Sequence, residues 1–250
     1  MNSNNTWQSE YPFESKAIEI EGNRYSYLDE GNQDGEVIVM LHGNPTWSFY
    51  YRNIVKSLAS THRCIVPDHI GCGMSDKPQD YAYTLENHVS NVLHLLKHLG
   101  ISKFKLLVHD WGGAIGMGVA TTRPTDVTGV IYLNTAAFRS LDIPKRIALC
   151  KLPLIGEPMV RTFNAFAWPA TFMTTTKPLK KHIKDGYLYP YGNYRNRIAT
   201  ARFVKDIPLS SKHPTYSLLS DIEAKLPNLE CPKMFLWGAK DFCFNMSFLS

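Results

Sequence analysis

Asp110 lies in the segment of the sequence best suited to chemistry. It follows the apolar run Phe104–Val108 and precedes Trp111-Gly112-Gly113 and a predicted helix, Ala114–Thr122. A tight turn between strand and helix holds one side chain above the carboxyl end of the sheet, where the helix N-terminus favours negative charge. A carboxylate there can displace a leaving group at carbon, giving an ester that water must then cleave. The structural alternative is that Asp110 only caps its helix.

A second segment, His42-Gly43-Asn44-Pro45-Thr46-Trp47, follows the buried-strand pattern Val37–Leu41. Asn44 carries a side-chain amide and Trp111 an indole N–H, and both are neutral hydrogen-bond donors. Two such donors beside a nucleophilic carboxylate can hold a leaving anion or a developing oxyanion. Taken alone, Asn44 fits a turn before proline and Trp111 fits a core position. Together with Asp110 they indicate an anion-binding site.

The elements that would position these residues alternate along the chain. Short strand patterns cover residues 16–21, 24–29, 37–41, 64–67, 104–108, 127–134 and 233–237. Helical patterns separate several of them, at residues 47–59, 84–99 and 114–122. Thr84 is placed to cap the second of these helices and Gly100 to stop it. This alternation predicts an α/β fold with a mainly parallel sheet covered by helices on both faces.

Three segments carry a resemblance to a known family: His42–Arg52 (HGNPTWSFYYR), Pro67–Pro78 (PDHIGCGMSDKP) and Leu107–Gly118 (LVHDWGGAIGMG). They resemble the haloalkane dehalogenase branch of the α/β-hydrolases, and within it the bacterial β-lactone decarboxylases of long-chain olefin biosynthesis. The segments Tyr187–Tyr191 and Arg197–Leu209 are also similar to the decarboxylases. The resemblance implies an α/β-hydrolase fold with an inserted helical cap, Asp110 as nucleophile, and Asn44 with Trp111 as halide or oxyanion donors.

The resemblance also implies a reaction. A hydrophobic dialkyl β-lactone would give a cis-alkene and carbon dioxide, with no cofactor and no metal. The alternative with the same residues is haloalkane dehalogenation through an aspartyl ester. Epoxide hydrolysis is a third alternative, but Asn44 stands where epoxide hydrolases usually carry an aromatic residue. Trp111 argues against a fluoroacetate dehalogenase, which has arginine after the nucleophile.

Asp241 matches the family's acid after the seventh strand, which orients a catalytic histidine. The segment Leu133–Ala136, where some dehalogenases carry this acid, has no carboxylate. No histidine follows Asp241; the last of the nine is His213, and His42 and His109 are expected to be structural. We therefore expect the last strand, the helix after it and the general base to be absent, so that a haloalkane would react only once. An inactive chain that serves as a scaffold is the alternative of another class.

The domain pattern changes after the sixth strand. We expect residues 1–137 and 217–250 to form the hydrolase core, incomplete at its C-terminus, and 138–216 to form a helical cap, since this segment has no strong strand pattern. An apolar substrate tunnel would pass through the cap. Its candidate lining residues are Phe163, Phe166, Trp168 and Phe172, although such aromatic residues are also ordinary core residues.

Charge is spread unevenly over the chain, whose net charge is +5. Residues 143–213 hold 13 Lys and Arg against 3 Asp and Glu, a net of +10, which leaves 14 against 19, or −5, elsewhere. Such a basic segment can meet pathway enzymes or a membrane surface, or can simply be solvated. No nucleic-acid-binding motif accompanies it, so we expect no nucleic-acid partner.

The composition and the first residues of the sequence indicate where in the cell the protein is expected. The chain is 44% hydrophobic and 20% charged, as globular proteins are. The polar start, residues 1–13, has no basic region followed by an apolar one, and no run approaches the roughly 20 apolar residues of a membrane span. The five cysteines are scattered and form no CxxC pair. These features predict a cytoplasmic protein with reduced thiols.

Overall fold

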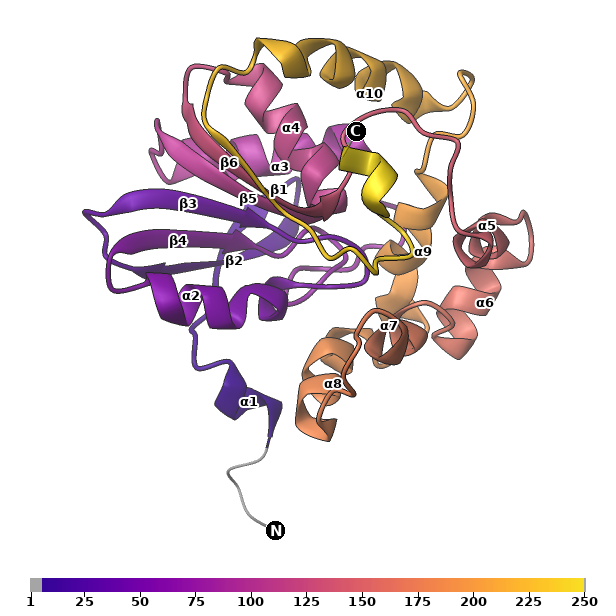
Figure 1. The fold of residues 1–250 in the computed structure, drawn as a ribbon. Helices are drawn as coiled ribbons and strands as arrows, with labels where there is room; N and C mark the ends of the chain where they lie inside the picture. Colours follow the sequence, from indigo (N-terminus) through magenta and orange to yellow (C-terminus); the bar gives the residue numbers. More distant parts are fainter. Residues whose placement is uncertain (1–5, 250) are drawn as a thin grey trace.

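The computed structural model describes residues 6–249. Its centre is a seven-stranded sheet in the order β1-β2-β4-β3-β5-β6-β7 (Figure 1). The first pairs, β1 with β2 and β2 with β4, are antiparallel, and all other pairs are parallel. The predicted α/β fold with a mainly parallel sheet is thus confirmed. The strands are β1 (Lys16–Ile20), β2 (Asn23–Gly31), β3 (Glu36–Leu41), β4 (His62–Pro67), β5 (Phe104–Asp110), β6 (Val127–Thr135) and β7 (Lys233–Leu236).

Helices cover both faces of the sheet. Helix α2 (Arg52–Leu58) lies on one face, and α3 (Leu85–His98), α4 (Trp111–Thr122) and α10 (Pro214–Lys225) lie on the other (Figure 1). The Thr84 hydroxyl caps α3 by accepting the Asn87 N–H at 3.4 Å. The helix expected over residues 47–59 begins as a 3-10 turn. Such turns occupy Ser48–Tyr51, Tyr189–Tyr191, Arg195–Arg197, Leu226–Asn228 and Met246–Leu249.

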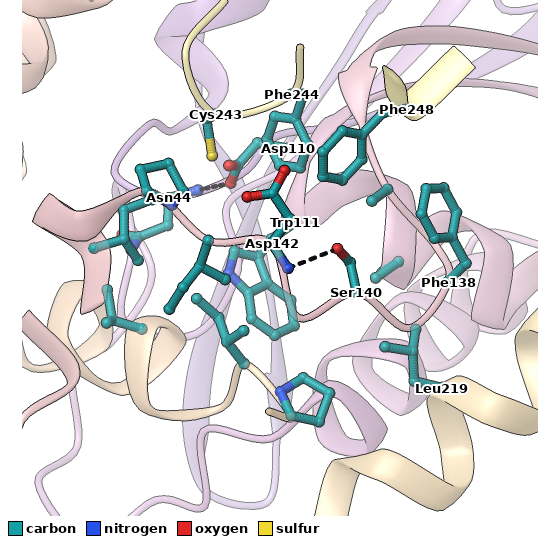
Figure 2. Close-up of a pocket in the computed structure, with 18 of the residues that line it drawn as sticks. Asn44, Asp110, Trp111, Phe138, Ser140, Asp142, Leu219, Cys243, Phe244 and Phe248 are labelled. Atoms are coloured by element: carbon teal, nitrogen blue, oxygen red, sulfur yellow. Dashed lines mark hydrogen bonds between the residues drawn. The ribbon is translucent and has the colours of Figure 1, made fainter. Parts of the chain in front are cut away.

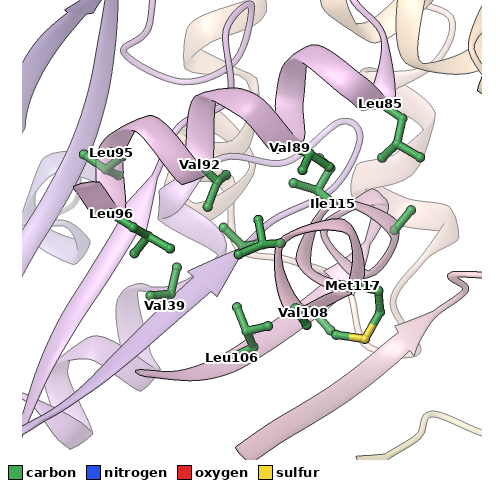
Figure 3. Close-up of a cluster of buried hydrophobic side chains, with 14 of the residues drawn as sticks. Val39, Leu85, Val89, Val92, Leu95, Leu96, Leu106, Val108, Ile115 and Met117 are labelled. Carbon is green, nitrogen blue, oxygen red and sulfur yellow. The ribbon is translucent and has the colours of Figure 1, made fainter. Parts of the chain in front are cut away.

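The main core forms between the apolar stripe of α3 and the sheet. Residues three and four positions apart on α3 point to α4 and to the buried strands β3 and β5, as Figure 3 shows. This stripe consists of Leu85, Val89, Val92, Leu95 and Leu96, and it meets Val39, Leu106, Val108, Ile115 and Met117. Because the strands of a parallel sheet are buried on both faces, continuous apolar runs such as those in β3 and β5 are what this packing requires.

Gly112 sets how closely α4 approaches the sheet. A Cβ atom at this position would lie 1.9 Å from the carbonyl oxygen of Leu41, a backbone atom with no room to move. We expect Gly112→Ala to lower the free energy of unfolding by about 2–3 kcal/mol, measured by urea denaturation. Gly192→Ala is the matched control, because nothing lies within 4 Å of its Cβ position. Equal stability of the two variants would contradict this packing.

The cap is inserted between β6 and α10. It consists of α5 (Lys145–Lys151), α6 (Gly156–Phe163), α7 (Ala167–Met173), α8 (Lys181–Leu188) and α9 (Ile198–Lys205). Figure 1 shows α9 between the sheet and the outer helices α5 and α6. The expected cap boundary at residue 216 falls inside α10, whose Leu219 and Ile222 belong to the main core. A short N-terminal helix, α1 (Trp7–Glu10), packs on the cap, where Trp7 lies 4.4 Å from Tyr189 between ring centroids.

Within residues 6–249, no helix combines the length and the apolar character that crossing a bilayer requires.

Candidate active site

Asp110 occupies the turn between β5 and α4. Its φ of 52° and ψ of −128° are rare for a residue with a side chain, so the backbone is strained at this point. The Thr135 hydroxyl donates to the Asp110 carbonyl at 2.5 Å and ties the turn to β6. Gly43 leaves room for the carboxylate, because a Cβ there would lie 2.0 Å from Asp110 Oδ1. The turn therefore presents one carboxylate above the carboxyl end of the sheet.

The Asp110 carboxylate accepts backbone N–H groups. The N–H of Asn44 donates to Oδ1 at 2.6 Å, and the N–H of Trp111 also bonds the carboxylate. Burial raises the pKa of Asp110 to about 7. The two N–H donors lower this pKa in part, and repulsion from the Asp241 carboxylate raises it. Near neutral pH the side chain therefore exists in both forms, and its anion is less stabilised than an exposed carboxylate.

This pKa predicts how ester formation depends on pH. Because only the carboxylate attacks, the rate of bromoalkane alkylation should rise about tenfold per pH unit below pH 7 and level off above it. Asp241→Asn removes the repelling charge but keeps an oxygen that can accept the same N–H groups, so the midpoint should move to lower pH. A stopped-assay pH profile of both proteins measures this. A midpoint that is unchanged in the variant would show that Asp241 does not act on Asp110.

Asn44 and Trp111 both line the pocket above Asp110. The Asn44 side-chain amide donates one hydrogen to the carbonyl of Thr200 on α9, at 3.0 Å, so the cap holds this side chain in place. Its second amide hydrogen and the indole N–H of Trp111 have no hydrogen-bond partner within residues 6–249. The structure thus brings together Asp110 and the two donors expected from the sequence.

The pocket between the sheet and the cap is mostly apolar and encloses about 870 Å³, part of it open to solvent (Figure 2). Its walls come from the turn after β6, from α5, α9 and α10, and from the segment after β7. Among the four aromatic residues expected along the tunnel, Phe166 lines this pocket. Phe163, Trp168 and Phe172 do not; they are exposed on the outside of the cap. The remaining apolar lining includes Ala136, Phe138, Ile143, Pro144, Ile147, Val204, Ile207, Leu219, Phe244 and Phe248.

Asp241 lies in the loop after β7, close enough to Asp110 to raise its pKa. Its Oδ1 accepts the N–H groups of Cys243 at 2.7 Å and Phe244 at 3.0 Å. Asn134, at the end of β6, clamps this loop. Its amide donates to the carbonyls of Gly238 and Phe244 at 3.1 and 3.2 Å, and its oxygen accepts the Gly238 N–H at 2.7 Å. The sequence analysis noted only that the segment Leu133–Ala136 has no carboxylate, and it did not predict this clamp. The signal was the side-chain amide of Asn134, which can both donate and accept hydrogen bonds.

The histidines near this site make other contacts. His42 bonds the Gly43 carbonyl through Nδ1 and accepts the His69 N–H on Nε2, so both ring nitrogens are occupied. His109 stacks on Tyr50, with ring centroids 4.5 Å apart. Burial lowers the pKa of both His42 and His109 to about 4. In the part of the chain that the structure describes, no histidine hydrogen-bonds to Asp110 or Asp241.

Comparison with known proteins agrees with this geometry. Residues 36–157 match a family model described as the alpha/beta hydrolase fold. The chain is 45% identical to the cis-3-alkyl-4-alkyloxetan-2-one decarboxylase of Shewanella oneidensis, over 95% of this chain and 77% of the relative. The chain belongs to the α/β-hydrolase family. This hydrolase is also 41% identical to haloalkane dehalogenase 2 of Mycobacterium tuberculosis, over 94% of this chain and 80% of the relative.

Solved structures give the same result for the fold of this hydrolase. The haloalkane dehalogenase DatA from Agrobacterium tumefaciens matches with a TM-score of 0.83 at 27% identity, over 94% of this chain and 82% of that one. A putative ancestral haloalkane dehalogenase matches with a TM-score of 0.81 at 28% identity, over 89% of this chain and 80% of that one.

Cys243 is a pocket residue of this hydrolase that the sequence did not single out. Figure 2 shows its sulfur beside the Asp110 carboxylate. Burial raises the pKa of the Cys243 thiol, and the carboxylates of Asp110, Asp241 and Asp142 raise it further. The thiol is therefore protonated at neutral pH and acts as a small apolar wall next to the carboxylate.

Proposed function

We propose that this chain uses Asp110 to decarboxylate a cis-3,4-dialkyl β-lactone to a cis-alkene. The observation that carries the proposal is the Asp110 carboxylate on a strained turn in an apolar pocket, with two neutral donors beside it. Within residues 6–249, no histidine is hydrogen-bonded to this carboxylate. The identity to a decarboxylase named for such a substrate supports the same choice.

The reaction begins with attack of the Asp110 carboxylate on the alkyl-bearing ring carbon that is bonded to the ring oxygen, not on the carbonyl carbon. The bond between this carbon and the ring oxygen breaks, so that Asp110 becomes an alkyl ester and the former lactone becomes a free carboxylate. The bond between that carboxylate and the neighbouring carbon then breaks, and its electron pair forms the double bond between the two alkyl-bearing carbons. Carbon dioxide leaves, and the ester C–O bond breaks to restore the Asp110 carboxylate.

This sequence of steps explains the stereochemistry and needs no water. Attack inverts the ring carbon, and anti fragmentation of the resulting ester converts a cis ring into a cis-alkene. No proton is taken up or released, so a general base has no task in the cycle. The free N–H of Asn44 and the indole N–H of Trp111 would hold the oxygen that leaves the ring carbon.

Haloalkane dehalogenation is the second candidate, supported by the identity to a haloalkane dehalogenase. It would start with the same ester on Asp110, while the two donors hold the departing halide. Its second step differs, because water must be activated by a base before it can cleave the ester. His42 and His109 are poorly basic and are engaged elsewhere. The described residues therefore favour the reaction that restores Asp110 without a base.

A product assay tests the proposal. The 250-residue chain is incubated with an excess of a cis-dialkyl β-lactone, and the organic phase is analysed by gas chromatography. We expect the cis-alkene in molar excess over the protein. Recovery of unchanged lactone would contradict the proposal, as would formation of the β-hydroxy acid, which is the product of lactone hydrolysis.

A further inference from the structure

Apolar side chains are exposed on the outer helices of the cap, away from the pocket. Leu154 is 94% exposed, Phe163 77% and Trp168 57%. They belong to a set that we call the cap rim: Leu149, Leu152, Leu154, Phe163, Trp168 and Phe172. These residues come from α5, from the turn after it, from α6 and from α7, which lie outside α9 in Figure 1. Several large apolar side chains exposed on neighbouring elements mark a candidate contact surface, as a single one does not.

The exposure of the cap rim is built into the backbone. Leu154 has a φ of 64°, a left-handed conformation that is unfavourable for leucine, and it turns this side chain into solvent. Trp168 and Phe172 are one helical turn apart on α7 and contact each other edge to face, with centroids 5.0 Å apart. The apolar groups thus project from a turn and, as a contacting pair, from a helix, and they can insert between lipids.

The segment that carries the cap rim is also rich in positive charge. Three cations of the cap, Arg161, Arg202 and Lys205, share the single carboxylate of Glu157 and hold α6 to α9. Other cations have no such internal role. Lys145, Arg146, Lys177 and Lys180 are exposed and form no salt bridge within residues 6–249. Arg146 reaches the Met173 sulfur at 3.5 Å, which places this α5 cation at the end of α7, beside the rim.

The same elements also line the pocket. On α5, Ile147 lines the pocket while Leu149 is exposed, and between α6 and α7, Phe166 lines the pocket while Phe163 and Trp168 are exposed. A ligand that leaves an apolar phase at the cap rim would therefore meet the pocket wall one helix diameter away. This connection between the cap rim and the pocket rests on the proposed function in one respect, which is the apolar character of the substrate.

We propose that the cap rim docks this protein on an anionic lipid surface. The cap carries a net charge of +10 over residues 143–213 while the rest of the chain carries −5, so an anionic bilayer attracts the cap and repels the core. Cations hold the cap at the headgroups, and the rim leucines and aromatic residues enter the interface. An acidic protein would be attracted by the same charges, but this attraction would not use the leucine and aromatic side chains that project into solvent.

Vesicle sedimentation tests this docking without measuring catalysis. The full chain is mixed with vesicles of phosphatidylcholine and phosphatidylglycerol in equal parts, or of phosphatidylcholine alone. We expect sedimentation with the anionic vesicles only, and release by high salt. Asp110→Asn should sediment like the parent chain, so that failure of the proposed reaction and failure of docking are seen separately. A parent chain that stays in the supernatant with anionic vesicles would overturn the proposal.

Two sets of variants test the assignment of the surface. Reversing Lys145, Lys177 and Lys180 to Glu should lower the vesicle partition coefficient by a factor of at least about 100, since each cation near an anionic surface contributes roughly fivefold. The matched control reverses three exposed lysines of the hydrolase core domain, Lys97, Lys103 and Lys225. It should change the vesicle partition coefficient by no more than a few-fold. Circular dichroism confirms that all variants are folded. Equal losses in both sets would overturn the proposal.

A separate variant tests the apolar side chains of the cap rim, and a lipid-free partner tests the alternative of an acidic protein. Leu154→Ser with Trp168→Ser should weaken binding to anionic vesicles at least about tenfold, because the buried apolar area is lost while the charge is kept. Soluble polyglutamate serves as a lipid-free acidic partner. If it binds the cap as tightly as the vesicles do, and the serine variant binds vesicles like the parent chain, the surface is one for an acidic protein and the lipid proposal fails.

Discussion

Asp110→Asn is expected to abolish both alkene formation from the β-lactone and ester formation with a bromoalkane, by a factor on the order of 10⁴ or more. Asparagine has nearly the same shape, and its oxygen can still accept the Asn44 N–H that donates to Asp110 at 2.6 Å. It has no negative charge with which to attack carbon. The loss therefore comes from chemistry and leaves the turn intact, and initial rates by gas chromatography measure it.

The stability of this variant serves as its control. Burial raises the pKa of Asp110 in the folded chain to about 7, above that of an unfolded aspartate. The stability that the protonated form contributes is present at low pH and is lost as the pH rises through about 7. At pH 8, Asp110→Asn should therefore melt at a higher temperature than the parent chain, while it has no activity. A variant that is inactive and also less stable would point to a structural role for Asp110.

A neighbouring carboxylate provides a second control. Asp142 belongs to the same pocket and, like Asp110, adds to the negative field at Cys243. It lies outside the strained turn, and Asp142→Asn should change the rate by no more than about tenfold through this field alone. A loss as large as that of Asp110→Asn would show that the wrong carboxylate has been assigned.

The second large effect is a difference between two substrates of the same protein. With a bromoalkane, this chain should release one equivalent of bromide and then stop, because within residues 6–249 no histidine is hydrogen-bonded to Asp110 or Asp241. With a β-lactone it should turn over many times, because decarboxylation restores the carboxylate. Bromide and alkene, each measured against the protein concentration, give the two stoichiometries.

Both outcomes of this comparison are informative. Bromide release that continues well beyond one equivalent would mean that a group in the chain activates water, and His42 and His109 would then need to be tested as the base. Alkene formation that stops at one equivalent would mean that the ester does not fragment as described. Either result contradicts the mechanism at a defined step.

Much of the fold follows from the sequence because it depends on local patterns. The runs Val37–Leu41 and Phe104–Val108 are apolar throughout, as strands buried on both faces must be, and they became β3 and β5. The turn at Asp110 is also local, since Gly112 and Gly113 permit close contacts that no other residue allows. Its position at the end of a buried strand then fixes where the carboxylate points.

The pocket was harder to predict because its walls depend on how the cap sits over the sheet. The spacing of Phe163, Phe166, Trp168 and Phe172 identifies aromatic residues, but it does not show which of them face inward. In the structure Phe166 lines the pocket, and the others form part of the exposed cap rim. The Asn134 clamp on the Asp241 loop joins residues more than 100 positions apart, so only the folded chain reveals it.

An Asp110 carboxylate that attacks carbon keeps the alkyl group as an ester. The most direct measurement is mass spectrometry of the chain after reaction with a bromoalkane, first intact and then as peptides. We expect a mass increase of one alkyl group, located on Asp110 and absent from Asp110→Asn. Alkylation of Cys243, which lines the same pocket, with Asp110 unmodified would contradict it.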